Sequence, residues 1–413
     1  MLPMDDVRIV DLTQYAMGPF ATRVLADYGA DVIKIERPGG DPARQLGPFP
    51  KDVPHIERSG AFLALNTSKR SVVVDLKRPE GRDLVLGLVE RAEIVVESFA
   101  PGTLDHLGLG YDRLRAVNPR IVLTSISNFG QTGPYRDWKG TDLTLYAMGG
   151  PMISQGDPSR EPLKTGGRAP GYQVGYAAAL ASAVGLTAAE RRGHGEHLDV
   201  SAFEVLAHSI DSRLGRLLGY QYNGRLVGRA GSGLGVGSGT YPCLDGFVLI
   251  TSGAPRLPLT IRMIGREDLL DQPEWATLEA RSHPDRVPEF DAYLLMWTLE
   301  HTKEEIRAAC QQYGVLGGPL NTTADLFVDR NFAARGFFQT IDHPEAGPLT
   351  YPGFQARFNT EPPQPPRKRA PLLGEHTVEV LRDVLGMQPA DIDRLRGAGV
   401  IQTREEVRDA VAS

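Results

Sequence analysis

Short apolar runs alternate with stretches of helical periodicity along the first 130 residues of the chain. The runs have the length of buried strands, and the segments between them carry apolar residues at the spacing of one helix face. Since the strand-like runs are predominantly apolar, we expect a parallel sheet covered by helices on both faces. The predicted strands are Val7–Leu12, Asp31–Ile35, Ser71–Leu76, Glu93–Val96 and Arg120–Ser125, and the predicted helices are Phe20–Tyr28, Gly81–Ala92 and a stretch across Leu104–Leu114.

The pattern changes in the second half of the chain. A glycine-rich stretch over 228–239 predicts a loop, which is either a linker or a flap over a site. A smaller α+β unit is predicted after it, and a proline-rich, basic connector then leads to a helical tail from His376. The corresponding ranges are two Ala- and Gly-rich helices over 142–153 and 172–191, a strand at Gly239–Leu249, helices at Ile264–Asp271 and Lys303–Tyr313, and the connector over 361–372.

Composition places the chain among globular enzymes. It has 413 residues, of which 41% are hydrophobic and 23% charged, and a net charge of −6. This length predicts two or three structural units. The net negative charge argues against a general attraction to nucleic acid or to an anionic membrane. The most apolar stretch, Ala177–Ala189, is short and contains Gly185, so it predicts a buried helix and not a membrane span.

The cysteines and the N-terminal residues indicate a cytoplasmic protein. Cys243 and Cys310 are too far apart for a CxxC or zinc pattern, so we expect two free thiols. The first residues show neither the basic nor the apolar region of a signal peptide. His194 and His197 are close in sequence but have no third ligand nearby, so no metal site is predicted.

The common catalytic fingerprints are absent from the sequence. There is no GxxxxGK[ST] phosphate loop, no HExxH and no GxSxG. The turn after the first predicted strand, Thr13–Gly18, has no GxGxxG either, so the sequence does not favour a nicotinamide dinucleotide enzyme.

Five segments, in order, carry a family resemblance across nearly the whole chain. They are VRIVDLTQYAMGPFATRVLADYGADVIKIERPGGD, NTSKRSVVVDLKRPEGRD with VVESFAPGTLDHLGLGYDRL, SISNFGQTGPYRDWKGTDLTLYAMGG, GVLGGPLNTTADLFVDRNFAARGFF and PLLGEHTVEVL. The chain resembles the class III CoA-transferases, which include formyl-CoA, carnitine and benzylsuccinate CoA-transferases and the related α-methylacyl-CoA racemases. The resemblance implies a Rossmann-like large domain (1–225 and 331–413), an inserted small domain (226–330) and an interlocked dimer.

The resemblance also implies a site for coenzyme A. CoA needs cations for its phosphates, an apolar slot for adenine and donors along its pantetheine arm. Ser98 stands where the family usually has asparagine, His106 where the formyl-CoA type has arginine, and Ala16 where that type has a glutamine near the thioester. The positions that match CoA contacts are Ala16, Met17, Arg37, Asp75, Leu76, Lys77, Ser98, Phe99, Ala100, His106 and Lys139.

In this family one aspartate attacks the acyl-CoA thioester and forms a mixed anhydride, then an aspartyl-CoA thioester that the acceptor acid attacks. The matching position, counted from Lys164 and Gly166 on one side and Gly175 on the other, is Gly171. Glycine has no side chain, so this acyl transfer is impossible at position 171. The sequence therefore predicts retained CoA binding with a missing nucleophile.

Neighbouring positions differ as well. Thr141 stands at the place of a tyrosine in the transferases and of a catalytic histidine in the racemases, while Asp142 keeps an acidic residue beside it. Tyr172, next to the vacant position, could donate a proton or fill space. Asp157 and Glu161 precede the catalytic segment and are candidate substitutes for the missing carboxylate, or ordinary surface acids.

Four hypotheses remain open. In the first, the chain is a subunit of a heteromeric CoA-transferase that moves CoA between carboxylic acids, and a homologous subunit supplies the aspartate. In the second, it is an ordinary CoA-transferase with a shifted nucleophile such as Asp157. In the third, it is an acyl-CoA lyase, hydratase or isomerase that uses Asp142 or Tyr172 as acid or base. In the fourth, it binds acyl-CoA without catalysis.

Overall fold

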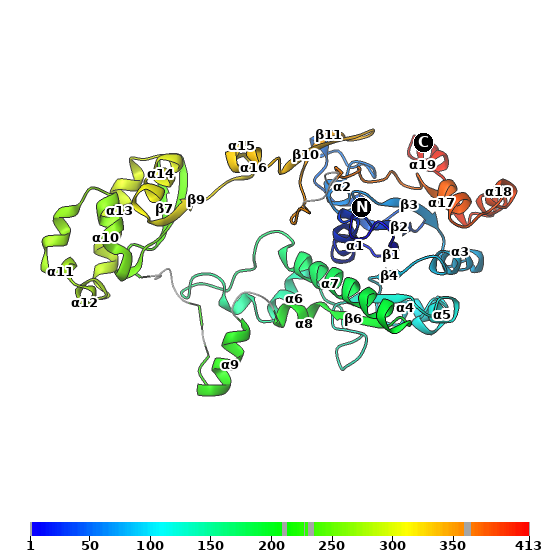
Figure 1. The fold of residues 1–413 in the computed structure, drawn as a ribbon, viewed down its shortest axis with the longest axis horizontal. Coiled ribbons are helices and arrows are strands. Elements are labelled where there is room, and N and C mark those ends of the chain that lie inside the picture. The colour runs from blue at the N-terminus through cyan, green and yellow to red at the C-terminus, as the bar shows by residue number, and fades with distance from the viewer. Residues whose placement is uncertain (1, 209–212, 227, 230–234, 359–364, 413) are drawn as a thin grey trace. The chain divides into compact units, whose positions relative to one another are not determined.

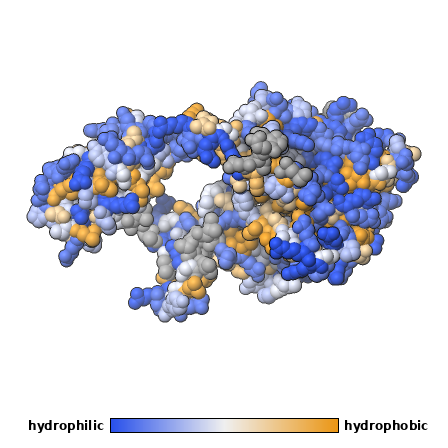
Figure 2. Space-filling view, viewed as in Figure 1, coloured by the Kyte–Doolittle hydropathy of each residue, from blue (hydrophilic) through white to orange (hydrophobic). Residues whose placement is uncertain are grey.

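The computed structural model describes residues 2–208, 213–226, 228–229, 235–358 and 365–412, and it separates into two compact units (Figure 1). The large unit comprises Met1–Met152, Lys164–Arg225 and Gly336–Ser413, so it contains both ends of the chain. The small unit comprises Ile153–Leu163 and Leu226–Arg335. Hydrophilic residues cover most of the visible surface of each unit (Figure 2).

The large unit is built on a seven-stranded sheet with the order β12-β3-β2-β1-β4-β5-β6. All neighbouring strands are parallel except β12, which runs antiparallel to β3 at the edge. The predicted parallel sheet is therefore confirmed, with β6 and β12 as additional strands. The direction in which strands are added reverses between β1 and β4, and sheets of this kind bind ligands outside the carboxyl ends near that point. The strands are β1 (Arg8–Leu12), β2 (Asp31–Glu36), β3 (Arg70–Val74), β4 (Ile94–Glu97), β5 (Val122–Ser127), β6 (His197–Ser201) and β12 (Ile401–Gln402).

Helices cover both faces of this sheet because successive strand residues point to opposite sides. Val10, Ile33 and Val95 face one core, which is completed by α3 (Pro79–Val89), α5 (Tyr111–Val117), α17 (Thr377–Asp383) and α18 (Pro389–Gly397). Ile9, Val32 and Ile94 face the other core, which is completed by α1 (Met17–Asp27), α7 (Ala169–Arg192) and α8 (Ala202–Ala207). The remaining α-helices among the described residues of this unit are α2 (Gly60–Leu65), α4 (Thr103–His106), α6 (Asp142–Met148), α9 (Arg213–Asn223) and α19 (Arg404–Ala412).

Glycines let α7 approach its neighbours closely. A Cβ on Gly175 would lie 2.7 Å from both the carbonyl oxygen of Met17 and a ring carbon of Phe20. A Cβ on Gly185 would lie 2.7 Å from Leu198 of β6. The small residues of α7 therefore hold its first turns against α1, beside the carboxyl edge of the sheet.

The C-terminal part of the chain is anchored to the N-terminal part by buried polar contacts. Arg367 forms a buried ion pair with Asp27 of α1, with Nε to Oδ1 and Nη2 to Oδ2 distances of 2.5 Å. The hairpin of β10 (Phe338–His343) and β11 (Gly347–Pro352) precedes this segment. Most of the predicted connector's first half, through residue 364, lies outside the described residues, as do residues 230–234 of the glycine-rich loop.

The small unit has an antiparallel sheet of β7 (Gly239–Cys243), β8 (Gly246–Thr251) and β9 (Leu316–Pro319). Its core is centred on the buried side chains of Trp275 and Phe290, and both cysteines are buried and free, as expected. Its helices are α10 (Gly253–Met263), α11 (Pro273–Ala276), α12 (Leu278–Arg281), α13 (Arg286–Leu299), α14 (Lys303–Tyr313), α15 (Thr323–Val328) and α16 (Arg330–Ala334).

Two predictions for the small unit were wrong in detail. The single strand expected at Gly239–Leu249 is a hairpin, because the chain turns between Cys243 and Gly246, whose φ is +152°. The helix expected at Ile264–Asp271 is a short 3-10 helix at Glu267–Asp271. In the part of the chain that the structure describes, no helix is both long and apolar enough to cross a membrane.

Candidate active site

The residues predicted to contact CoA follow neighbouring strands at the carboxyl edge of the large-unit sheet. Arg37 comes directly after β2 and Lys77 shortly after β3, and both are exposed. Met17 begins α1 after β1, Ser98 follows β4, and Lys139 lies in the loop after β5. Because β3, β2, β1, β4 and β5 are adjacent in this order, the fold brings these segments to one edge.

A hydrogen bond joins the turns that follow β1 and β4. The Oγ of Ser98 accepts the backbone N–H of Gln14 at 2.9 Å. The backbone N–H of Phe99 donates a hydrogen bond to Oε2 of Glu97 at 2.7 Å, and the partly buried Phe99 ring packs against the core that contains Val10 and Val95. Ser98 therefore fixes the start of the segment that carries Ala16 and Met17, whereas the exposed Ala100 is directed to the surface.

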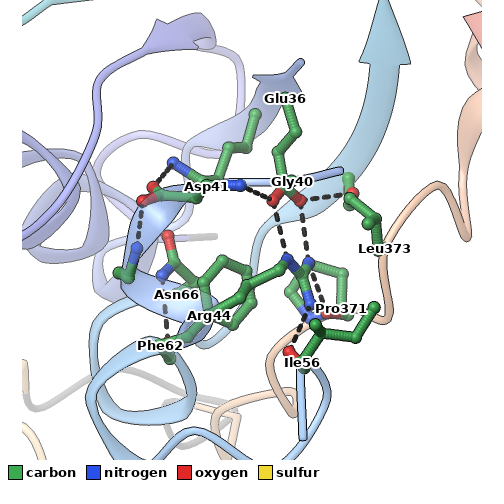
Figure 3. Close-up of polar contacts among 12 residues, drawn as sticks. Glu36, Gly40, Asp41, Arg44, Ile56, Phe62, Asn66, Pro371 and Leu373 are labelled. Carbon is green, nitrogen blue, oxygen red and sulfur yellow. Dashed lines mark hydrogen bonds and ion pairs between the residues drawn. The ribbon is translucent and has the colours of Figure 1, made fainter. Parts of the chain in front are cut away.

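Buried ion pairs stabilise the loop that carries Arg37 (Figure 3). Arg44 contacts Glu36 at 2.7 Å and Glu57 at 2.7 Å, and Lys34 lies 2.8 Å from Asp41. The side chain of Asp41 also accepts a hydrogen bond from the backbone N–H of Tyr15 at 3.1 Å. Tyr15 has a left-handed backbone with φ of +65°. The same network of buried ion pairs thus stabilises both the loop that carries the exposed Arg37 and the strained turn between β1 and α1. Sequence analysis did not single out Tyr15.

Gly171 is buried in the first turn of α7. A Cβ built on it would lie 3.5 Å from Cγ of Met17 and 3.9 Å from Oδ1 of Asp142. Both are ordinary van der Waals distances, so packing does not require glycine here. The first atom of a side chain at position 171 would meet Met17, a predicted CoA contact, on one side and the Asp142 carboxylate on the other.

Asp142 and Lys164 form an ion pair beside Gly171. The distance from Nζ of Lys164 to Oδ2 of Asp142 is 2.8 Å, and the two side chains are 19% and 31% exposed. Nζ also donates to the carbonyl oxygens of Thr165 and Gly167, at 3.0 and 2.6 Å. Lys164 therefore holds the segment before α7 against the carboxylate. In the sequence, Lys164 served only as a reference position for locating residue 171, because no sequence pattern indicates that it pairs with Asp142.

The other candidate residues have local roles in the structure. Thr141 is the N-cap of α6, where it forms a capping box with Thr144. The ring of Tyr172 lies 4.8 Å from that of Phe20. Asp157 belongs to the small unit and accepts hydrogen bonds from the N–H and Oγ of Ser159. Glu161 is exposed in the same segment.

Glu97 is a buried carboxyl group at this edge that sequence analysis did not single out. Burial raises its pKa to about 7, although hydrogen bonds from Ser125 and from the Phe99 N–H oppose the shift. The negative charges of Asp105 and Asp199 add to the increase. The sequence offered one signal for this site, because Glu97 is an acidic residue at the end of a short apolar strand. Glu97 thus takes up a proton near neutral pH directly beside the predicted CoA contacts.

Replacing Glu97 with glutamine is expected to stabilise the protein at alkaline pH. The pKa of Glu97 is higher in the folded chain than its ordinary value of 4.5, so its contribution to stability is full below that value and is lost as pH rises through 7. Relative to the natural chain, the variant should gain about 2 kcal/mol in the free energy of unfolding between pH 5 and pH 8. Urea unfolding at both pH values measures this gain.

The exposed Glu90 offers a matched control for this experiment, because its change to glutamine removes the same charge at the surface of the large unit. Glu90→Gln should show no such pH-dependent gain. Equal behaviour of the two variants would mean that Glu97 is ionised in the folded protein without cost.

No group of three or more His, Cys, Asp or Glu side chains that could hold a metal is found among the described residues.

Comparison with known proteins gives a consistent family. A sequence model of CoA-transferase family III matches residues 4–377. The chain is 33% identical to succinyl-CoA–D-citramalate CoA-transferase from Chloroflexus aurantiacus over 97% of its length and 98% of that protein. It is also 33% identical to a subunit of succinyl-CoA:(R)-benzylsuccinate CoA-transferase from Thauera aromatica, over 96% and 98% of the two chains.

A solved structure agrees with these relatives. The fold matches that of a CAIB/BAIF family protein from Brucella suis with a TM-score of 0.82 and 31% identity, over 93% of this chain and 99% of that one. The resemblance to class III CoA-transferases is thereby confirmed. This chain belongs to CoA-transferase family III.

Proposed function

We propose that this chain is a subunit of a heteromeric CoA-transferase that binds CoA or acyl-CoA but does not carry the nucleophile. The observation that carries the proposal is Gly171, which leaves no carboxylate in the first turn of α7. The exposed cations Arg37 and Lys77 at the carboxyl edge support retained CoA binding, because phosphates bind best to such groups.

A homologous subunit with aspartate at the matching position would perform the transfer. Its carboxylate forms a bond to the acyl carbon of the thioester, and CoA leaves as the thiolate. The thiolate then attacks the aspartyl carbonyl of the anhydride and releases the donor acid, and the acceptor acid takes over CoA in the same two steps reversed. The Thauera relative, itself named as a subunit, is consistent with such an assembly.

The finer features of the fold that the family resemblance implies belong to the same proposal. We infer a Rossmann-like large domain over 1–225 and 331–413 and a small domain over 226–330. We also infer that two chains interlock, either as a homodimer or with the aspartate-bearing subunit. Both partners would work in the cytoplasm.

Mixing experiments test this function. The purified chain alone is expected to show no CoA transfer from succinyl-CoA to a panel of dicarboxylic acids. Activity should appear when the chain is combined with a homologous family III subunit that carries the aspartate. Changing the matching aspartate of that subunit to asparagine should abolish the activity. Equal turnover by the single chain would overturn the proposal.

A second candidate is an acyl-CoA lyase, hydratase or isomerase that uses Asp142 as acid or base. The favouring observation is the position of Asp142 Oδ1, 3.9 Å from where a side chain at 171 would begin. Such an enzyme would convert an acyl-CoA without any acceptor acid, and Asp142→Asn would abolish that conversion.

A further inference from the structure

The loop between β5 and α6 carries an arginine that none of the predicted CoA positions includes. Aromatic rings brace this loop: Tyr135 and Trp138 stack with ring centroids 3.9 Å apart, and Phe129 packs edge-on against both. Phe203 of α8 completes the cluster through contacts with the rings of Phe129 and Tyr135. Arg136 lies between the two stacked residues in sequence, so its backbone is held in place.

The side chain of Arg136 reaches across to the turn that follows β4. A Cβ built on Gly102 would lie only 2.9 Å from Nη2 of Arg136 and 3.7 Å from the ring of His106. Gly102 has a left-handed backbone with φ of +82°, so a side chain is disfavoured there on two grounds. The glycine thus leaves room for the guanidinium beside the segment that contains Ser98, Phe99 and Ala100.

This guanidinium is available to a ligand. The one ion pair described for it is with Asp137 at 3.3 Å, where the two side chains are 39% and 78% exposed. Exposed pairs of this kind contribute little and exchange readily. An arginine held over a ligand-binding edge with such a weak partner is suited to a phosphate, which it can bind through two hydrogen bonds.

His106 is less suited to that task. Its Nδ1 lies 2.5 Å from the carbonyl oxygen of Gly102, so this nitrogen is turned toward the protein backbone. Position 106 therefore does not supply the permanently charged group expected there, while Arg136 places one beside the same turn.

We propose that Arg136 binds a phosphate of CoA and replaces the arginine expected at position 106. The inference rests on the proposed CoA binding. It adds a residue from the β5–α6 loop to a site otherwise formed after β1 to β4, and it makes the phosphate end of CoA lie against residues 98–102.

Calorimetric titration of CoA into the full chain tests this proposal. Arg136→Gln is expected to raise the Kd for CoA by about 10- to 30-fold, as for the loss of a charged hydrogen-bonding pair. Arg120 provides the matched control, because it is exposed and precedes β5 at the opposite edge of the sheet. Arg120→Gln removes the same charge and should leave the Kd unchanged.

Dephospho-CoA identifies the phosphate. If Arg136 holds the 3′-phosphate, the natural chain and Arg136→Gln should bind dephospho-CoA equally. If it holds the diphosphate, the difference between them should persist. In both cases, adding His106→Arg to Arg136→Gln should restore most of the affinity for CoA, because it returns a guanidinium to the same turn.

An unchanged Kd for CoA in Arg136→Gln overturns the assignment of Arg136 alone. A natural chain that does not bind CoA at all overturns the proposed function together with it. Circular dichroism of each variant verifies that the loss of affinity is not a loss of folding.

Discussion

Replacing Gly171 with aspartate is expected to give the purified single chain a CoA-transferase activity that the natural chain lacks. The change restores the carboxylate that can form an anhydride with the acyl group. Loss of a nucleophile costs several orders of magnitude in enzymes that use covalent catalysis, so the gain should be at least about 100-fold over the natural chain.

The structure indicates that the variant will fold. The nearest atoms to a Cβ at position 171, apart from the chain neighbours and local helix backbone, are Met17 Cγ at 3.5 Å and Asp142 Oδ1 at 3.9 Å. An acidic side chain in the first turn of α7 is favoured by the helix dipole. Repulsion from Asp142 is reduced because Lys164 lies 2.8 Å from that carboxylate. We therefore expect the variant to differ in stability by less than about 1 kcal/mol.

Transfer from succinyl-CoA to a panel of dicarboxylic acids measures the gain, and hydroxylamine trapping followed by peptide mass analysis locates the intermediate. Gly171→Asn is the matched control, since it has the same size but cannot form an anhydride. A folded Gly171→Asp variant that binds CoA but neither transfers it nor reacts with hydroxylamine would contradict the assignment of position 171.

The sheet of the large unit could be predicted from sequence because its strands are buried on both faces. The run Ile94–Val96 is apolar and fully buried in β4, and runs of this kind stand out between amphipathic helices. β6 was missed because the polar, exposed residues His197 and Asp199 interrupt its apolar pattern and it lies at the edge of the sheet. β12 was missed because it has only two residues and pairs with a strand more than 300 residues away.

The small unit was harder to predict for a different reason. β8 alternates between buried and exposed residues and only two residues separate it from β7, so the two resemble one long strand. The turn signal that was overlooked is the pair Asp245-Gly246. α10 contains Pro258, which usually ends a helix. Local pattern alone could not show that the fold tolerates this proline.

Residues of the candidate site could be predicted only where the sequence of one segment is enough to identify them. Counting residues leads to Gly171, and strand ends lead to Arg37 and Lys77. Contacts between segments were not accessible: the pairing of Lys164 with Asp142, and the approach of Arg136 to Gly102, depend on how loops fold together. The roles of these residues in CoA binding and transfer stay predictions.

The second large effect is expected from Arg44, which lies below the loop that carries Arg37. Its guanidinium donates to both carboxylate oxygens of Glu36, at 2.7 and 2.8 Å, and to Oε2 of Glu57 at 2.7 Å. It also stacks 3.6 Å from the centre of the Phe62 ring. Figure 3 shows that these contacts join the end of β2 to the C-terminal segment around Pro371 and Leu373.

Arg44→Met is expected to lower the free energy of unfolding by about 3 to 5 kcal/mol, because it leaves buried carboxylates without their main cation. Burial opposes ionisation of Glu36, but the charge and hydrogen bonds of Arg44 outweigh it and lower the pKa of Glu36 to about 2. That contribution to stability is present above the ordinary pKa of 4.5 and is lost as pH falls toward 2. The variant should therefore lose less stability on acidification than the natural chain.

Arg382 provides the comparison that separates burial from the loss of an ion pair. It forms a two-point pair with Asp383, at 2.6 and 2.9 Å, but both side chains are at least half exposed. Arg382→Met should cost less than about 1 kcal/mol. Combining Arg44→Met with Glu36→Gln and Glu57→Gln should recover part of the lost stability, since no buried charge then remains in the trio. Urea unfolding of the four proteins measures these differences, and equal losses for Arg44→Met and Arg382→Met would show that the support beneath the Arg37 loop does not depend on buried charge.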